Sequence, residues 1–284
     1  RTLLRGSGLD LADLREYQLH DDVRHIDWNV SARMQTPYVR VFTEDREMAA
    51  WFLLDLSASV DFGSGRHAKR QVSAEFVAVL ARLLTRHGNR VGALLYGAGV
   101  EKMIPARASR THVLHLLHAI RHRPAPAAPT ARTTTRLSDL LLAAANATRR
   151  RSTIFVVSDF ISEPGWEKPL AQLATRHEVV AVRLLDPLEL ELPDLGLLTL
   201  RDAETGEHLL VDTHDPRFRR RFAAIAAQRE AELRAALARA GVDTLELSTE
   251  DDLASAIVRF TEMRRQRARL AAGGGMPAHL RKSA

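Results

Sequence analysis

Oxygen-bearing side chains occur in three separate segments of the chain, at spacings that suit a hard metal ion. In the first segment, residues 55–59, one carboxylate and two hydroxyls stand two residues apart. The second is a run of threonines at 133–135, and the third ends in an aspartate at the end of an apolar run. This set offers oxygen donors and no nitrogen or sulfur, and Mg²⁺ prefers oxygen donors. The candidate ligands are Asp55, Ser57, Ser59, Thr135 and Asp159.

Hydrophobic strands lead into two of these segments. Residues 48–54 form a continuous apolar run that reaches Asp55, and residues 153–157 form another that leads into Ser158 and Asp159. Continuous apolar runs of this length are typical of buried strands in a parallel sheet. Ligand sites in such sheets lie beyond the carboxyl ends of the strands, so we expect both carboxylates at one edge. The threonines precede a predicted helix, from which their hydroxyls can point toward the same place.

Strands and helices alternate along most of the chain, which predicts an α/β fold with a doubly wound, mostly parallel sheet. Residues 186–212 are expected to form a loop with a hairpin at Thr205-Gly206, and residues 124–129 a Pro/Ala linker. We expect residues 48–268 to form the α/β domain. Residues 1–47 are predicted to be an N-terminal extension that packs onto it, and residues 269–284 a disordered tail.

Composition narrows the classes of function. The net charge of +6 comes almost entirely from arginine, which is typical of a GC-biased bacterial protein and does not itself indicate nucleic-acid binding. The basic stretch 217–222 contains Phe218 and Phe222, which share one helix face and are expected to pack into the core. There is no cysteine, and no apolar run approaches the roughly 18 residues of a membrane span. With no secretory signal at the N-terminus, we expect a cytoplasmic protein with no nucleic-acid partner and no membrane span.

The Asp-x-Ser-x-Ser string resembles the metal-ion-dependent adhesion site of the von Willebrand factor A fold. The resemblance implies that residues 55–59 form the first ligand loop, that Thr135 belongs to the second and that Asp159 belongs to the third. Two departures stand out. Threonines replace the family's glycines before Thr135, so Thr134 is an alternative ligand, and Ser158-Asp159-Phe160 replaces the commoner Thr-Asp-Gly.

The N-terminal segment carries a longer pattern: Leu14-Arg15-Glu16-Tyr17, then Asp21-Asp22-x-Arg24-x-Ile26-Asp27-Trp28, then Ser31-Ala32-Arg33. It resembles the signature of the bacterial domain-of-unknown-function family fifty-eight. Members resemble von Willebrand factor A domains and are commonly associated with MoxR-type AAA+ ATPases, which are chaperone-like. Many carry membrane helices before the signature, and this chain shows none.

The resemblance implies a metal-ion-dependent protein-interaction module that catalyses nothing. It would hold Mg²⁺ or Mn²⁺ with one coordination position open, and an Asp or Glu of a partner protein would fill that position. A MoxR-type ATPase, or its client, is the expected partner.

Other interpretations of these residues remain open. Asp55 and Ser57 are also good helix N-caps, as is Thr135. The charged residues between Asp21 and Arg33 favour a salt-bridged structural cluster over catalysis. Four histidines at helical spacing leave a zinc site as a minor possibility: His112, His115, His118 and His122.

The alternative function is a haloacid dehalogenase-like, Mg²⁺-dependent phosphotransferase. In such an enzyme an aspartate at the end of the first strand, here Asp55, is the nucleophile. A second carboxylate is wanted two residues later, where this chain has Ser57. A lysine on a later loop is also wanted, and Lys168 is the best candidate.

Overall fold

A computed structural model of the chain describes residues 9–18, 21–44, 49–65, 67–122, 134–201 and 207–271. The chain divides into two compact units, Arg1–Met48 and Ala49–Ala284. The candidate ligands all belong to the second unit.

The first unit is built on an antiparallel pair of strands, β1 (Leu9–Glu16) and β2 (Tyr38–Glu44). A short 3₁₀ turn, η1 (Val23–His25), and helix α1 (Trp28–Met34) lie between them in the sequence. The sequence of β2 alternates between apolar and other residues around Val39 and Val41, which is typical of a strand, whereas β1 is polar and carries no such clear signal. The paired residues Leu14 and Arg40 are 26 positions apart in the sequence, so no local signal reveals the pairing.

The charged residues of the signature have local structural roles in this unit. Arg24 pairs with Asp22 at 2.7 Å, and Arg15 pairs with Asp21 at 2.6 Å. Asp27 caps the N-terminus of α1, because its side chain accepts hydrogen bonds from the backbone N–H groups of Asn29 and Val30. The expected single cluster is therefore two local ion pairs and a helix cap.

The second unit contains a six-stranded sheet. Its order is β10 (Asp243–Ser248), β7 (Glu178–Leu185), β6 (Thr153–Ser158), β3 (Ala49–Asp55), β4 (Arg90–Tyr96) and β5 (Val100–Arg107). Every neighbouring pair is parallel except β4 and β5. From β3 the chain first builds outward through β4 and later returns to the other side through β6. The strand order thus reverses at β3, and such a switch point is where doubly wound sheets bind ligands.

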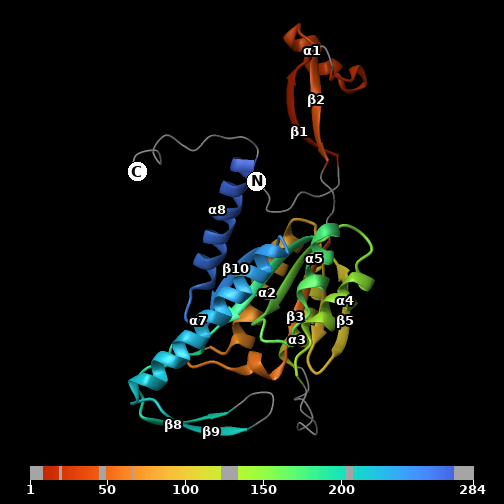
Figure 1. Cartoon of the computed structure of the whole chain (residues 1–284). Helices are drawn as coiled ribbons and strands as arrows, with labels where there is room; N and C mark the ends of the chain where they lie inside the picture. The colour runs from red at the N-terminus through yellow and green to blue at the C-terminus, as the bar shows by residue number, and fades with distance from the viewer. Residues whose placement is uncertain are drawn as a thin grey trace, which may run out of the picture. The chain divides into compact units, whose positions relative to one another are not determined.

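Helices cover both faces of the sheet (Figure 1). On one face, α4 (Leu137–Ala147), α5 (Glu167–Arg176) and α7 (Pro216–Arg239) share a core with Trp51 and Leu53 of β3. On the other face, Phe76 of α2 (Lys69–Arg86) packs edge-on against Phe52 and Phe155. Because successive residues of a strand point to opposite faces, the continuous apolar run of β3 serves both cores. The predicted α/β class is confirmed.

The remaining elements are α3 (Arg110–Arg121), the short α6 (Pro187–Leu190), α8 (Leu253–Ala271) and a hairpin of β8 (Leu197–Arg201) and β9 (His208–Asp212). The hairpin confirms that prediction, although its turn and the 124–129 linker lie outside the described residues. Helix α8 continues past the predicted start of the tail at 269. Across the described residues, no helix has both the length and the apolar character needed to cross a membrane.

Candidate metal-binding site

Asp55 lies at the carboxyl end of the central strand, and its side chain is fully buried. Its register partner on β4 is Tyr96, and the register with β6 ends one residue earlier, at Leu54 and Val157. Asp55 Oδ1 accepts a hydrogen bond from the Ser57 backbone N–H at 3.0 Å, and Oδ2 accepts one from the Ser158 hydroxyl at 2.6 Å. The carboxylate is therefore held at the switch point by its own loop and by the adjacent strand.

The two serines that follow Asp55 turn their hydroxyls toward each other. Ser57 Oγ and Ser59 Oγ are 3.1 Å apart, and both residues are buried. Ser57 precedes the 3₁₀ turn η2 (Ala58–Asp61), but its side chain makes no capping hydrogen bond. Helix capping therefore does not account for the Ser57 hydroxyl.

Asp159 follows β6 and is also buried. Its Oδ1 accepts a hydrogen bond from the Ile161 backbone N–H at 3.0 Å. Burial raises the pKa of Asp55 to about 6, and the Asp159 carboxylate adds to the rise, while hydrogen bonds from Ser158 and Ser57 oppose it. The two predicted carboxylate ligands are thus close enough to repel each other in a poorly solvated place.

The residue after Asp159 takes the backbone conformation that glycine would favour. Phe160 has φ = 59°, in the left-handed region that few non-glycine residues adopt. Its N–H donates to Ser158 Oγ at 2.9 Å, and its ring lies 5.4 Å from that of Trp166. The departure from Thr-Asp-Gly therefore preserves a glycine-like turn, and ring packing offsets its strain.

Thr134 and Thr135 differ in their surroundings. Thr135 is buried, whereas Thr134 is exposed and its hydroxyl donates to Glu163. The Thr135 carbonyl accepts hydrogen bonds from the Glu163 N–H and the Ser162 hydroxyl, both at 2.9 Å. The second loop is thus tied to the loop after β6.

Tyr96, which the sequence analysis did not single out, joins the first and second loops. Its carbonyl accepts from the Leu56 N–H at 2.7 Å, and its hydroxyl accepts from the Arg136 N–H at 2.9 Å. Burial is the main cause of a raised pKa for Tyr96, and the nearby Asp55 carboxylate contributes. All three predicted loops are therefore connected to one another at this edge of the sheet.

Lys69 is a second residue that was missed. Its side chain is completely buried, and Nζ lies 2.7 Å from Asp159 Oδ2 and 2.6 Å from Glu189 Oε1. It is one of only four lysines in an arginine-rich chain, but its sequence position gives no sign that it reaches Asp159. The contact spans 90 residues.

Asp186, at the end of β7, ties this edge of the sheet together from the other side. It accepts hydrogen bonds from the Ser64 N–H at 2.8 Å, the Ser64 hydroxyl at 2.6 Å and the Thr249 hydroxyl at 2.8 Å. Burial by itself would raise the pKa of Asp186, but these hydrogen bonds outweigh it and lower the pKa. The loop after η2 is therefore anchored to the ends of β7 and β10.

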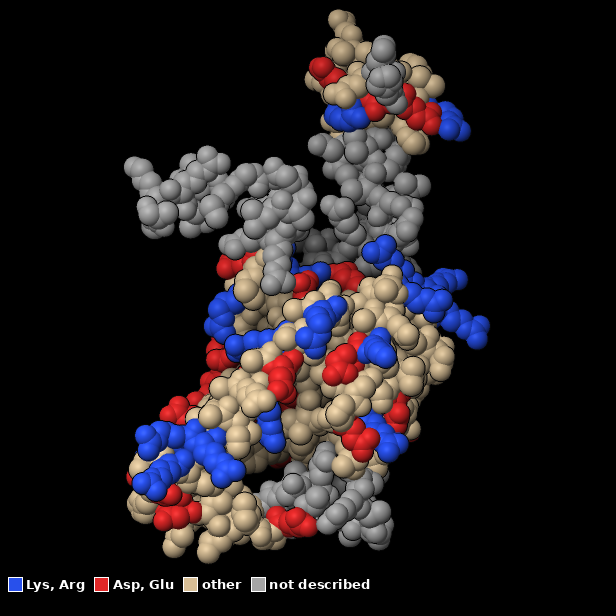
Figure 2. Space-filling view, in the orientation of Figure 1, with Lys and Arg blue, Asp and Glu red and all other residues tan. Residues whose placement is uncertain are grey.

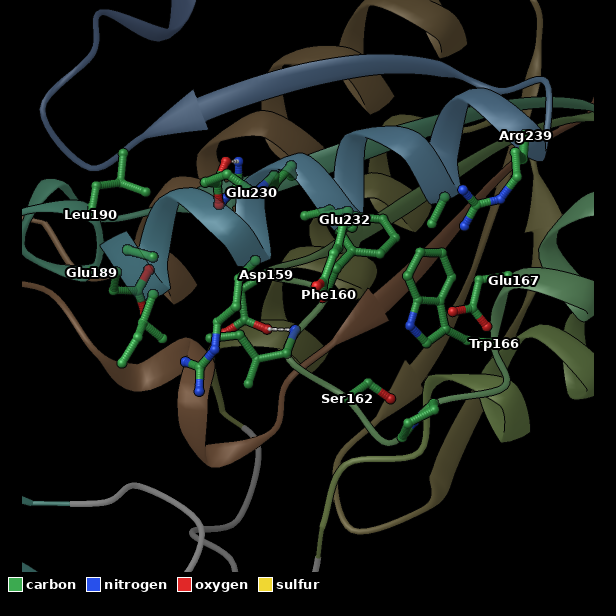
Figure 3. Close-up of a pocket in the computed structure, with 18 of the residues that line it drawn as sticks. Asp159, Phe160, Ser162, Trp166, Glu167, Glu189, Leu190, Glu230, Glu232 and Arg239 are labelled. Carbon is green, nitrogen blue, oxygen red and sulfur yellow. Dashed lines mark hydrogen bonds and ion pairs between the residues drawn. The ribbon is translucent and has the colours of Figure 1, made fainter. Parts of the chain in front are cut away.

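A cavity of about 1050 Å³ adjoins the site (Figure 3). Asp159 and Glu189 stand on its wall, with Phe160, Trp166 and one face of α7. Phe222 of α7 also lines it and is half-buried, so the expectation that this ring belongs to the core was wrong. Figure 2 shows lysine and arginine gathered over the N-terminal part of α7, where Arg217, Arg220 and Arg221 are exposed.

The histidine helix does not form a metal site in the part of the chain that the structure describes. His112 is buried and its Nε2 contacts the Val91 carbonyl at 2.9 Å, while the rings of His118 and His122 stack at 4.1 Å. Among the described residues, no three His, Asp or Glu side chains are grouped to hold a metal. The predicted Mg²⁺ ligands are not such a group, because two of them are carboxylates and the other three are hydroxyls.

Lys168, the lysine that the phosphotransferase alternative requires, is exposed on α5.

Comparison with known proteins finds mycobacterial relatives that are uncharacterized. The uncharacterized protein Rv1480 of Mycobacterium tuberculosis is 37% identical over 265 residues, which cover 93% of this chain and 82% of that protein. An uncharacterized protein of Mycobacterium avium, MAV169, is 41% identical over 118 residues, covering 42% of this chain and 69% of that one.

Among solved structures, an aerotolerance-related membrane protein from Bacteroides fragilis aligns with a TM-score of 0.51 at 12% identity, covering 77% of this chain and 99% of that one. The hypothetical protein BatB from Bacteroides thetaiotaomicron aligns with a TM-score of 0.49, also at 12% identity, covering 78% and 99%.

The family model "Protein of unknown function DUF58" matches residues 13–232, a span that includes the N-terminal signature and every candidate ligand. The expected family and its von Willebrand factor A-like fold are confirmed: the chain belongs to the DUF58 family.

Proposed function

We propose that this protein is a protein-interaction module that binds a partner through one divalent cation, Mg²⁺ or Mn²⁺. The ligands would be Asp55, Ser57, Ser59, Thr135 and Asp159. The observation that carries the proposal is the burial of two mutually repelling carboxylates, Asp55 and Asp159, beside a pair of facing hydroxyls. Lys69 pairs with Asp159, whereas Asp55 accepts hydrogen bonds from neutral donors, so a divalent cation bound by both carboxylates would offset the cost of burying the Asp55 charge.

The chemistry of the donors fits a small, hard cation. Carboxylate and hydroxyl oxygens suit Mg²⁺, which keeps several waters in an octahedral shell. A bound ion would supply a Lewis-acidic point for a carboxylate from outside. Two ligand carboxylates balance the charge of the ion without exceeding it, which favours capture of an acidic side chain of a partner. The chain's own contribution is rigidity, since Ser158 and the Ser57 N–H orient Asp55.

The cavity beside Asp159 offers room for a segment of the partner next to the ion. The family resemblance suggests a MoxR-type AAA+ ATPase, or its client, as that partner. Binding to the purified ATPase, measured with Mg²⁺ and with a chelator, tests this part separately. A cytoplasmic location is the setting we propose for such a pair.

A thermal unfolding experiment tests the metal site. Mn²⁺ or Mg²⁺ should raise the melting temperature of the wild type, because an ion that binds only the folded state stabilises it. Asp55→Asn should abolish the rise. Asp215→Asn is the matched control, since Asp215 is an exposed helix cap and asparagine caps equally well. An identical metal response of wild type and Asp55→Asn would show that the assignment is wrong.

A further inference from the structure

Lys69 occupies a position that lysine normally avoids. It is the first residue of α2, where the helix dipole disfavours a cation, and its side chain has no exposure to solvent. Removing an ammonium group from water is strongly unfavourable unless the group is paired. Two carboxylates provide the pairing, Asp159 and Glu189. A residue that violates two local rules and is compensated this closely points to a role at the neighbouring site.

The ammonium group already neutralises one of the candidate metal ligands. Asp159 Oδ1 is held by the Ile161 N–H, and Oδ2 is held by Lys69 Nζ. Asp55, by contrast, accepts hydrogen bonds from neutral donors among the described residues, the Ser57 N–H and the Ser158 hydroxyl. Arg70 lies at the same edge, but it donates to the Leu56 carbonyl and pairs with Asp61. Lys69 instead pairs directly with a candidate ligand, Asp159.

From this asymmetry we infer that Lys69 is an internal cation that competes with the divalent ion for Asp159 and sets how tightly the site binds it. The inference rests on the proposed metal site. An ion that takes Asp159 as a ligand must weaken its contact with Lys69, which retains Glu189 as a partner. Glu189 is suited to that task because its other carboxylate oxygen is fixed by the Asp186 N–H at 3.1 Å in a capping box.

The arrangement would favour a site that exchanges its ion. Without Lys69, the ammonium charge beside Asp159 and Glu189 would be absent, and an ion bound at Asp159 would be held more tightly. With Lys69 this edge of the sheet carries one negative charge less, both in the absence and in the presence of the ion. Occupancy then responds to the concentration of the ion and to the carboxylate of a partner.

Mn²⁺ binding to the full chain, followed by the electron paramagnetic resonance signal of the free ion, tests the inference. Lys69→Met should bind Mn²⁺ at least about tenfold more tightly than the wild type, because a unit charge within a few ångströms of a divalent ion is removed. Lys168→Met removes the same charge from the exposed face of α5 and should leave the affinity unchanged.

A second variant covers the case in which Lys69→Met fails to fold. Glu189→Gln leaves Lys69 with Asp159 as its one carboxylate partner, so Mn²⁺ binding should weaken several-fold. Its side chain is partly exposed, which makes the change tolerable. Glu167→Gln, on the same cavity wall, is the control.

The outcomes separate this inference from the proposed function. If the wild type binds Mn²⁺ and Lys69→Met binds it equally or more weakly, the role of Lys69 is wrong while the metal site stands. If Lys69→Met alone binds, and loses the ion on adding Asp55→Asn, Lys69 is the resident cation and the wild-type metal site is wrong. Absence of binding in both chains overturns both.

Discussion

The Ser158 hydroxyl donates a 2.6 Å hydrogen bond to Asp55 Oδ2 across two adjacent parallel strands. Ser158 Oγ also accepts a hydrogen bond from the Phe160 N–H at 2.9 Å. One side chain thus orients the carboxylate at the end of β3 and shapes the turn after β6. The residue replaces threonine of the commoner family pattern and retains its hydroxyl.

Replacing Ser158 with alanine should therefore destabilise the fold by about 1–3 kcal/mol, since the buried Phe160 N–H loses its acceptor and Asp55 loses a donor. The pKa of Asp55 should rise further, because a hydrogen bond that lowers it is removed. Urea unfolding at neutral pH measures the first effect. Thr175→Ala, which removes an exposed hydroxyl bonded within its own helix, should change stability by less than about 0.5 kcal/mol. Equal effects of the two changes would contradict this role for Ser158.

Asp186→Asn should destabilise the protein in a pH-dependent way. The folded-state pKa of Asp186 lies below its ordinary value of 3.8. Its ionised form therefore contributes stability above about pH 4, and the contribution is lost as pH falls through the lower folded-state pKa. The difference in unfolding free energy between wild type and variant should be largest at neutral pH and shrink below pH 4. A difference that stays constant down to pH 3 would show that the hydrogen bonds act without the charge.

Arg183 on β7 and Glu230 on α7 form a buried ion pair, with side chains 8% and 16% exposed. Arg183→Met or Glu230→Leu alone should each cost about 3 kcal/mol, because the remaining charge is poorly solvated and keeps only a longer contact, Arg183 with Glu246 at 3.6 Å or Glu230 with Arg234 at 3.9 Å. The double variant should return to within about 1 kcal/mol of the wild type. A double-mutant cycle from chemical denaturation measures the coupling. If the two losses simply add, the pair does not hold α7 against the sheet.

At position 160 we expect the glycine variant to be more stable than the alanine variant. Both substitutions remove the ring from Trp166 and should be destabilising by about 3–5 kcal/mol. At φ = 59°, however, alanine keeps the strain of a side chain in the left-handed region and glycine does not. We expect Phe160→Gly to be about 1 kcal/mol more stable than Phe160→Ala, the reverse of the order in a helix. Thermal unfolding of the two variants decides the point.

The phosphotransferase alternative predicts that the protein hydrolyses phosphoesters, whereas the proposed interaction module would not. With Mg²⁺ and a generic phosphoester, we expect no hydrolysis above that of a chain carrying Asp55→Asn. Hydrolysis that disappears in that variant would make Asp55 a nucleophile and replace the proposed function. A phosphate-release assay at saturating phosphoester is sufficient.

The alternation of strands and helices, and the loops that carry oxygen donors, could be predicted from the amino-acid sequence. Buried strands such as residues 153–158 can be predicted from their continuous apolar character. Asp55-x-Ser57-x-Ser59 is a local motif, so its spacing can be identified from the sequence alone. The signature between Leu14 and Arg33 likewise indicated the family, because all of its parts lie in one short segment of the chain. Such local patterns follow from short-range geometry and burial, which one chain segment is enough to express.

Which charged groups contact one another at the site could not be predicted from the sequence, because it depends on how distant segments pack. Lys69 lies 90 residues from Asp159, and Ser64 lies 122 residues from Asp186, so neither contact leaves a mark on local spacing. The same holds for Tyr96, whose backbone and hydroxyl join two loops from a strand that reads simply as apolar. Burial is what gives these contacts their electrostatic strength, and burial of a polar group depends on every element packed around it.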